Sequence, residues 1–268
     1  KRFIMSRNLN ICGIPLNSVW CDKQSNLEAL EQNLSTQPAT IDIVVLPEMF
    51  STGFVINDKN QVAELAERNI DNTIYCIKKL SAKYNIAICG SHIARTNTRF
   101  YNRAFFIEPS GDEVYYDKHH LFSYGNEQTV YSSGNSLPPI IRFRGWNIMP
   151  IICYDLRFPV WCRNVGRKYD LMIVMANWPK VRERAWDQLL IARAIENQCY
   201  VCGINRTGTD GNSIVYPDDS SYIIDYKGNI ISEKRNENIF ASLDYEKYSK
   251  FNEKFTALSD ADSFSINL

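Results

Sequence analysis

The chain has 268 residues, of which 45% are hydrophobic and 22% are charged, and its 30 Lys and Arg residues balance its 30 Asp and Glu residues. This balance excludes a net field that would attract nucleic acid or an acidic membrane surface, and no apolar stretch approaches the roughly 20 residues needed to span a bilayer. The size and composition are typical of one large α/β domain, which we expect to extend over residues 1–268.

Strand and helix patterns alternate from the start of the chain. The apolar run at 9–16 predicts a strand, and the segment 25–34 predicts an amphipathic helix in which Ser25 and Glu28 have the spacing of a capping box. The nearly continuous apolar run at 41–48 is typical of a strand that is covered on both faces.

The remaining elements follow without a linker, a repeat or a low-complexity segment. Two of them are hairpins, so the order is mixed rather than a strict βαβ repetition, and we expect helices on the outer faces of the sheets. In chain order the patterns predict a helix over 74–84 that ends near Asn85, a strand over 86–93, a hairpin over 103–121 turning at Pro-Ser-Gly, a strand over 146–154, a helix over 159–169, a strand over 170–178, a helix over 183–198, a strand over 200–206, a hairpin over 220–232 turning at Lys-Gly-Asn, a strand over 239–245 and a surface tail from 258.

Eight cysteines are present. Because the chain is large and residues 1–15 lack the apolar block of a signal peptide, we expect reduced thiols and a cytoplasmic protein. Cys199 and Cys202 form a C-x-x-C pattern, but no second cysteine pair or nearby histidine completes a metal site. Side chains that are three residues apart in a strand should face opposite ways, so we expect no metal there.

Three predicted strands end on residues that can carry chemistry. "VVLPE" ends on Glu48, "VYYDK" ends on Lys118 and "MPIIC" ends on Cys153. In layered α/β folds, functional sites are built at the edge where strands finish, so a carboxylate, an ammonium and a thiol can converge there.

This trio forms a set for acyl transfer without histidine. A thiolate attacks carbonyl carbon well, and Glu48 could accept the thiol proton and later pass it to a departing amine. The ammonium of Lys118 would lower the thiol pKa of Cys153 and stabilise the oxyanion. The backbone N–H of Tyr154 is a natural second donor to that oxyanion, as in a nucleophile elbow.

Each residue also has a simpler explanation. Cys153 could be a small core residue, Glu48 could cap a helix, and Lys118 could face solvent. His119 and His120 additionally permit a Cys–His pair, because histidine is the commoner base.

The segments "LPEMFSTGF", "YDKHHLF" and "CYDLRFPVW" together resemble the signature segments of the nitrilase, or carbon–nitrogen hydrolase, superfamily, and the resemblance covers nearly the whole chain. It implies that Glu48 is the general base, Lys118 the oxyanion-stabilising lysine and Cys153 the nucleophile. It also implies that Glu127 orients Lys118 and the substrate, although Glu127 could instead be a surface-loop glutamate.

The resemblance further implies a fold and an assembly. The expected fold is a four-layer αββα sandwich, with mixed sheets and helices on the outer faces. Two copies are expected to pair through outer faces as a homodimer, or to form a higher homo-oligomer, and no metal or organic cofactor is implied.

Within the superfamily, "CYDLRFPVWCRN", "ANWP" and "DSFS" are most similar to bacterial omega-amidases. Those enzymes deamidate 2-oxoglutaramate and 2-oxosuccinamate to the 2-oxo acids. The same residues also serve aliphatic amidases, N-carbamoyl-amine hydrolases, nitrilases and acyl transferases, since a fold does not fix its substrate. A non-catalytic binding module is a further alternative, which the intact set of four site residues argues against.

The expected 2-oxo acid monoamide carries a carboxylate at the end remote from its amide. We expect an arginine to bind it, because a guanidinium contacts a carboxylate at two points. Arg157, four residues after Cys153, is the first candidate, unless it forms a structural ion pair with Asp155 or Glu127. Arg206 is a weaker candidate.

Three further residues are expected to line the substrate pocket. Asn177 and Trp178 follow a strand end, as Cys153 does, and Phe54 and Trp178 could form apolar walls. Aromatic residues of this chain could equally belong to the core.

Overall fold

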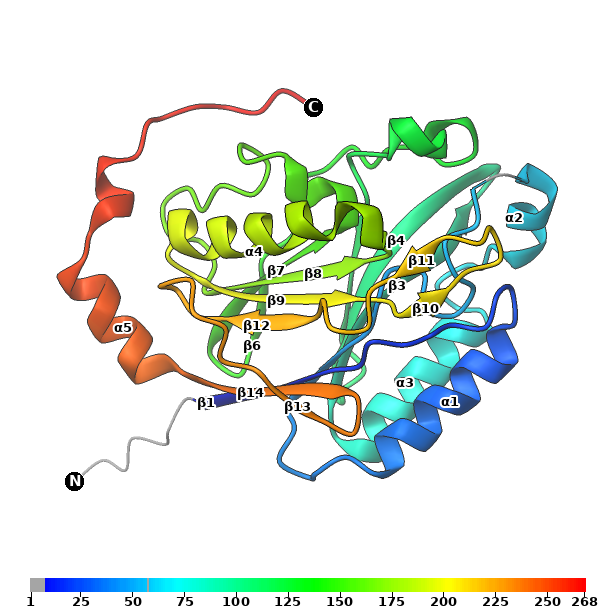
Figure 1. Ribbon diagram of the computed structural model, residues 1–268, viewed down its shortest axis with the longest axis horizontal. Coiled ribbons are helices and arrows are strands. Elements are labelled where there is room, and N and C mark those ends of the chain that lie inside the picture. The colour runs from blue at the N-terminus through cyan, green and yellow to red at the C-terminus, as the bar shows by residue number, and fades with distance from the viewer. Residues whose placement is uncertain (1–7, 57) are drawn as a thin grey trace.

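The computed structural model of the chain describes residues 8–56 and 58–268 (Figure 1). Two β-sheets lie face to face, and helices cover their outer faces. The predicted four-layer αββα arrangement with mixed sheets is therefore confirmed.

The larger sheet has the strand order β13-β14-β1-β2-β3-β4-β5. Its central strands β1, β2 and β3 run parallel, and the other neighbours run antiparallel. The strands are β1 (Asn8–Gly13), β2 (Ile43–Val45), β3 (Ala87–Thr96), β4 (Arg99–Ile107), β5 (Glu113–Asp117), β13 (Glu233–Arg235) and β14 (Asn238–Asp244).

The second sheet has the order β12-β9-β8-β7-β6, with a parallel centre of β7, β8 and β9. Its strands are β6 (Ile141–Phe143), β7 (Trp146–Ile152), β8 (Leu171–Ala176), β9 (Tyr200–Asn205) and β12 (Tyr222–Ile224). A short pair, β10 (Gly208–Thr209) and β11 (Val215–Tyr216), stands apart from both sheets.

Three helices form the outer layers (Figure 1). α1 (Lys23–Ser35) and α3 (Asn72–Tyr84) cover the larger sheet, and α4 (Glu183–Asn197) covers the second. The short α2 (Lys59–Leu65) and the helix α5 (Tyr245–Lys254) complete the set. None of the helices formed by residues 8–56 and 58–268 is both long and apolar enough to cross a membrane.

The ends of α1 and α3 follow from local side chains. α3 ends at Asn85, as predicted, where the backbone turns left-handed with φ of 55°. The predicted capping box of Ser25 and Glu28 is wrong, because Asp22 is the N-cap of α1 and its carboxylate accepts both the N–H and the hydroxyl of Ser25. The helix therefore starts at Lys23, before the predicted box.

The predicted helix over 159–169 is also wrong. A 3₁₀ turn over Cys153–Arg157 leads instead into a series of turns. The side chain of Asn164 accepts the N–H of Tyr169 and donates to its carbonyl oxygen, which gives the backbone an alternative to helical bonds. Gly166 and Arg167 then adopt left-handed backbone angles, which end any helix.

Both predicted hairpin turns form, but the second hairpin is incomplete. β4 and β5 pair around Pro-Ser-Gly as expected. In the segment 220–232 the strand β12 pairs with β9, and its return arm makes only an isolated bridge between Ile224 and Ile230.

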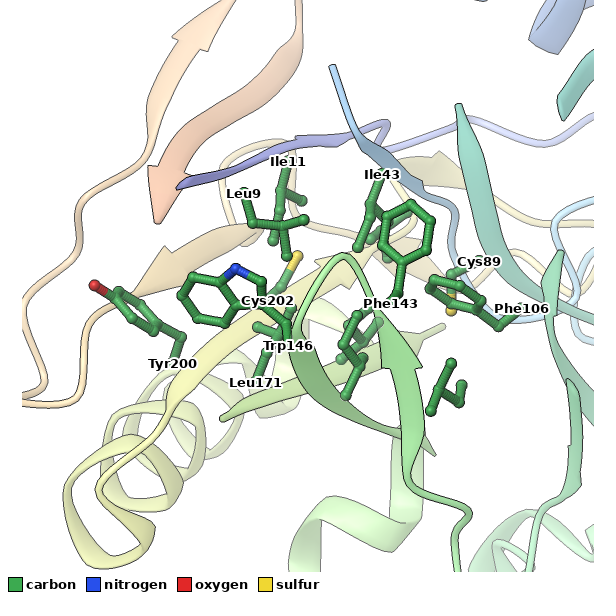
Figure 2. Packing of buried hydrophobic residues seen from close by; sticks show 14 of the residues in the cluster. Leu9, Ile11, Ile43, Cys89, Phe106, Phe143, Trp146, Leu171, Tyr200 and Cys202 are labelled. Atoms are coloured by element: carbon green, nitrogen blue, oxygen red, sulfur yellow. The ribbon is translucent and has the colours of Figure 1, made fainter. Parts of the chain in front are cut away.

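The main hydrophobic core lies between the two sheets (Figure 2). Leu9, Ile11 and Ile43 from the larger sheet face Trp146 and Leu171 from the second, all of them fully buried. Burying each such side chain stabilises the fold by roughly 1.5–3 kcal/mol. This core fixes the two sheets against each other and so fixes the edge where their strands end.

The two cysteines of the C-x-x-C pattern point to opposite sides of the second sheet, as predicted. Cys202 packs in the core between the sheets, and Cys199 packs in the separate cluster beneath α4. The two thiols therefore face opposite sides of the second sheet, and all eight cysteines are free.

Candidate active site

Glu48, Lys118 and Cys153 lie where three strands end, at one edge of the paired sheets. Lys118 directly follows β5, Cys153 directly follows β7, and Glu48 comes three residues after β2. Cys153 has φ of 44°, and Met49, the residue after Glu48, has φ of 47°. The segments that follow β2 and β7 thus each contain a residue with left-handed backbone angles, which turns the backbone sharply at the site.

One buried ammonium lies between two buried carboxylates. The Nζ atom of Lys118 is 2.8 Å from Oε1 of Glu48 and 2.9 Å from Oε2 of Glu127, and all three side chains are fully buried. Burial opposes the charge on Lys118, but the two carboxylates outweigh it and raise the pKa of the ammonium above its ordinary value. Burial also raises the pKa of Glu127, although Lys118 acts against that shift.

The carboxylate of Glu48 is fixed by several donors. Its Oε1 accepts the amide of Asn102 at 2.7 Å in addition to Lys118, and its Oε2 accepts the backbone N–H of Asn177 at 2.9 Å. The side-chain amide of Asn177 donates to the backbone carbonyl of Glu48 at 2.8 Å. Glu48 therefore has a fixed orientation, as a proton acceptor and donor requires.

Asn102 of β4 joins both glutamates and was not predicted as a site residue. Its Nδ2 donates to Glu48 at 2.7 Å and to Glu127 at 3.4 Å, while its Oδ1 accepts the hydroxyl of Ser91 at 3.0 Å. The Ser91 hydroxyl in turn accepts the N–H of Met49 at 2.8 Å. A usable signal existed, because Asn102 shares its strand face with core residues Ala104 and Phe106, where a polar side chain needs a partner.

Glu127 is no surface-loop residue. It is fully buried, and besides Lys118 its Oε2 accepts the backbone N–H of Phe122 at 2.6 Å. The segment between Lys118 and Glu127 is thereby folded back onto the lysine.

The groups around the thiol of Cys153 raise its pKa. Burial, together with the charge of Glu48, raises its pKa well above the ordinary value, whereas Lys118 and the backbone N–H of Asn177 lower it. Lys118 lowers the thiol pKa, as expected, but burial and the charge of Glu48 outweigh this effect. The arrangement suits a neutral thiol that loses its proton to a neighbouring base during attack.

Cys153 and Lys118 open into a cavity of about 610 Å³. Five of the residues predicted to bind substrate line it, and no Asp or Glu is among its lining residues. Those predicted residues are Phe54, Tyr154, Arg157, Asn177 and Trp178.

The two predicted arginines occupy different places. The guanidinium of Arg157 faces the cavity, 4.8 Å from the centre of the Trp178 ring. Arg206 is fully buried behind the cavity wall, where its guanidinium lies 4.7 Å from the ring of Tyr216. Tyr216 lines the cavity but Arg206 does not, so only Arg157 can meet a ligand directly.

The alternative ion pairs of Arg157 are not formed. Asp155 is occupied by the hydroxyl of Tyr116 at 2.9 Å and by the ring of His120 at 2.9 Å. Glu127 is bound to Lys118, as described above. Arg157 is thus left to face the cavity without either carboxylate.

Neither candidate histidine lines the cavity. His120 stacks on Phe158 with ring centres 3.7 Å apart, and His119 stacks on Trp161 at 4.1 Å. The Nδ1 atom of His119 lies 2.7 Å from the carbonyl oxygen of Gly134. Within the described ranges, no group of three or more His, Cys, Asp or Glu side chains is arranged to hold a metal ion.

Arg182 also lines the cavity and was not predicted. It lies in the 3₁₀ turn Lys180–Arg182 between β8 and α4, where neither strand nor helix periodicity gives a signal. Its place at the cavity depends on how that turn packs.

Comparisons with known proteins agree with this geometry. The sequence profile of the family described as carbon-nitrogen hydrolase matches residues 7–251. Omega-amidase YafV of Escherichia coli (strain K12) is 40% identical over 251 residues, which cover 92% of this chain and 94% of that protein. 2-Oxoglutaramate amidase of Bacillus subtilis (strain 168) is 32% identical over 244 residues, covering 88% and 90% respectively.

A solved structure has the same fold. XC1258 from Xanthomonas campestris, described as a CN-hydrolase superfamily protein with an arsenic adduct in the active site, superposes with a TM-score of 0.90. The two are 36% identical, and the match covers 97% of this chain and 99% of that one.

Proposed function

The chain belongs to the carbon–nitrogen hydrolase family, and from this premise we propose that it is an omega-amidase. It hydrolyses the terminal amide of a small 2-oxo dicarboxylic acid monoamide, such as 2-oxoglutaramate or 2-oxosuccinamate, to the acid and ammonia. The observation that carries this proposal is the cavity lined by Cys153, Lys118 and Arg157, with Glu48 bound to Lys118 directly behind it and no described residue forming an ion pair with the Arg157 guanidinium.

The first half-reaction forms a thioester. The sulfur of Cys153 attacks the amide carbonyl carbon while its proton passes to Glu48. The carbonyl oxygen becomes negative and is stabilised by the Lys118 ammonium and the backbone N–H of Tyr154. When the carbon–nitrogen bond breaks, Glu48 returns the proton to nitrogen, and ammonia leaves.

The second half-reaction releases the acid. Glu48 takes a proton from a water molecule as the water oxygen attacks the thioester carbon. The carbon–sulfur bond then breaks, and the proton returns to the sulfur of Cys153. Because the pKa of the Cys153 thiol is raised, the sulfur leaves with the proton from Glu48 as a neutral thiol rather than as a thiolate.

Two residues support the reacting groups from behind. Glu127 balances the charge of Lys118 and directs it toward the cavity. Asn102 holds the carboxylates of Glu48 and Glu127 in fixed positions through its amide. Both residues contact Lys118 or Glu48, whereas it is Glu48 that reaches the thiol of Cys153, so Glu127 and Asn102 act by positioning.

Substrate choice rests on the carboxylate at the end remote from the amide. The guanidinium of Arg157 lies over the ring of Trp178, 4.8 Å from its centre, and we propose that it grips that carboxylate at two points. Phe54 and Trp178 supply apolar walls, and Asn177 anchors the wall to Glu48. Aliphatic amidase, N-carbamoyl-amine hydrolase and nitrilase activities use the same chemistry but gain nothing from this arginine.

The test compares 2-oxoglutaramate with butyramide, which lacks the carboxylate, in the parent enzyme and in Arg157→Lys. We expect the parent to hydrolyse 2-oxoglutaramate with a kcat/KM at least about a hundredfold higher, since butyramide leaves the half-buried guanidinium of Arg157 without a partner. Arg157→Lys should reduce that ratio, because an ammonium cannot reproduce the two-point grip. Equal kcat/KM on both amides in the parent would refute the omega-amidase assignment.

We further propose that residues 1–268 act as one domain and that the protein is a cytoplasmic homodimer. The match to relatives over nearly their full length supports the single domain. Val160, Val165 and Ile195 are exposed apolar residues on the outer side of the second sheet, where a partner could cover them. Light scattering of the purified protein measures the oligomeric state.

A further inference from the structure

Arg182 is held at the cavity by its backbone. Its carbonyl oxygen accepts the indole N–H of Trp178 at 2.9 Å, and its own N–H donates to the carbonyl of Pro179 at 2.9 Å. Its half-buried guanidinium lies 5.2 Å from the ring centre of Phe122 and 5.9 Å from that of Tyr124. The side chain is therefore supported by aromatic rings, while the turn beneath it is fixed.

The charges around the cavity do not balance. The Lys118 ammonium is neutralised from behind by Glu48 and Glu127. Arg157 and Arg182 also line the cavity, and no described residue forms an ion pair with either of them. Two guanidinium groups thus face a space whose lining residues carry no negative charge, which favours an anionic ligand.

Both guanidinium groups are organised around one indole. The ring of Trp178 lies against Arg157, and its Nε1 holds the turn that carries Arg182. Arg157 belongs to the 3₁₀ turn that starts at Cys153, close to the thiol. Arg182 lies next to Tyr124 and Val181, which are 82% and 86% exposed, so it marks the mouth of the cavity.

The cavity has room for both positions. Its volume of about 610 Å³ falls within the roughly 300–1,000 Å³ of sites that hold drug-sized ligands. A small monoamide bound with its amide at Cys153 and its carboxylate at Arg157 does not fill it. The outer part beside Arg182 can therefore be occupied by the same substrate only while it enters or leaves.

We propose that Arg182 is a specificity-determining residue that captures the carboxylate of an anionic amide at the cavity mouth before Arg157 binds it. This role rests on the proposed function, because it presumes a substrate with a carboxylate. A fixed cation at the mouth raises the local concentration of anions and accelerates their entry, and it leaves neutral amides unaffected. The turn below Arg182 is held by hydrogen bonds, so it keeps the guanidinium in place each time a substrate molecule approaches.

The experiment compares Arg182→Gln, Arg182→Lys and the control Arg184→Gln. Arg184 is an exposed arginine two residues further on and does not line the cavity. The kcat/KM for 2-oxoglutaramate and for butyramide is measured at low and high ionic strength. Arg182→Gln should lower kcat/KM for 2-oxoglutaramate about tenfold or more at low salt, mainly through KM, and should flatten its salt dependence.

Three companion results are expected. Arg182→Gln should leave butyramide hydrolysis unchanged, Arg184→Gln should match the parent, and Arg182→Lys should keep the salt dependence because it keeps the charge. An equal effect of Arg182→Gln and Arg184→Gln overturns the proposal. So does an equal loss on both amides together with a lower melting temperature, which would indicate a structural role for the turn.

Failure of the proposed function gives a different result. If the parent enzyme shows no preference for 2-oxoglutaramate over butyramide, the omega-amidase assignment is wrong. The same comparison with succinamate, a carboxylated amide without the 2-oxo group, then decides the role of Arg182. A salt-dependent preference for succinamate that Arg182→Gln abolishes supports it, and no such preference overturns it.

Discussion

The ammonium nitrogen of Lys118 lies 2.8 Å from a carboxylate oxygen of Glu48, and neither side chain is exposed to solvent. In such a site the two charges interact far more strongly than they would in water. The pair therefore supplies both a fixed positive charge beside the thiol and a carboxylate that is ready to exchange protons.

Replacing Glu48 by Gln should remove proton transfer from both half-reactions. We expect kcat for ammonia release to fall by more than about a hundredfold, the lower end of the effect of general acid–base catalysis. Glu64→Gln is the matched control, because Glu64 is exposed on α2, and it should retain parental activity. Near-normal turnover in Glu48→Gln would assign the base to another group.

The pH profile should show no ionisation of the thiol. Because burial and Glu48 raise the pKa of Cys153 well above its ordinary value, the resting thiol stays protonated at neutral and mildly alkaline pH. The kcat/KM should therefore stay level through about pH 8.5, where an ordinary cysteine ionises. An increase in kcat/KM with a midpoint near that pH would mean that a preformed thiolate attacks instead.

Removing the ammonium should destabilise the fold. Lys118→Met leaves the carboxylates of Glu48 and Glu127 buried without a counter-charge, so the free energy of unfolding should fall by about 3–5 kcal/mol. The deficit should shrink as the pH is lowered, because the folded variant gains stability when a buried carboxyl takes up a proton.

Urea unfolding at several pH values measures this deficit. The control is Lys83→Met, which breaks the exposed pair of Lys83 with Glu31 and should cost no more than about 1 kcal/mol. Equal losses in the two variants would contradict a special role for the buried ammonium.

Asn102→Asp tests the link between the two carboxylates. The new carboxyl can donate to Glu48 only when it is protonated, and it repels both glutamates once it ionises. Activity should therefore be kept best at acidic pH and should be lost as the pH rises, by about tenfold or more at neutral pH. A pH profile parallel to that of the parent would show that Asn102 has only a structural role.

The residues at strand ends could be predicted because their signals are local. Cys153 ends an apolar run, and Lys118 and Glu48 close two others, so each stands where a buried strand gives way to polar residues. Chain order alone then places them at one edge of the sheets. The family resemblance added Glu127, for which no periodic pattern exists.

Residues defined by tertiary packing could not be predicted in the same way. Asn102 meets Glu48 across 54 positions of sequence, and Arg182 reaches the cavity through a turn without periodicity. The effect of burial, which outweighs that of Lys118 on the pKa of Cys153, could not be predicted for a related reason, since the extent of burial is set only when the sheets pack.

The helix α5 also could not be predicted from its local sequence pattern. Its residues Tyr245 and Tyr248 pack on Trp146, and Phe251 packs on Tyr226. These aromatic contacts join strands and turns that are distant in sequence, so the helix forms where the local pattern gives no strong signal.

The left-handed backbone of Cys153 lowers the stability of the fold at the residue that catalysis requires. A residue with a Cβ atom at φ of 44° carries strain of roughly 1–2 kcal/mol, which a glycine would avoid. A thermostability screen of this protein should therefore favour Cys153→Gly over Cys153→Ala, although neither variant retains the nucleophile. Any selection that rewards only a higher melting temperature acts against the enzyme at this position, and the thiol persists only where turnover is selected as well.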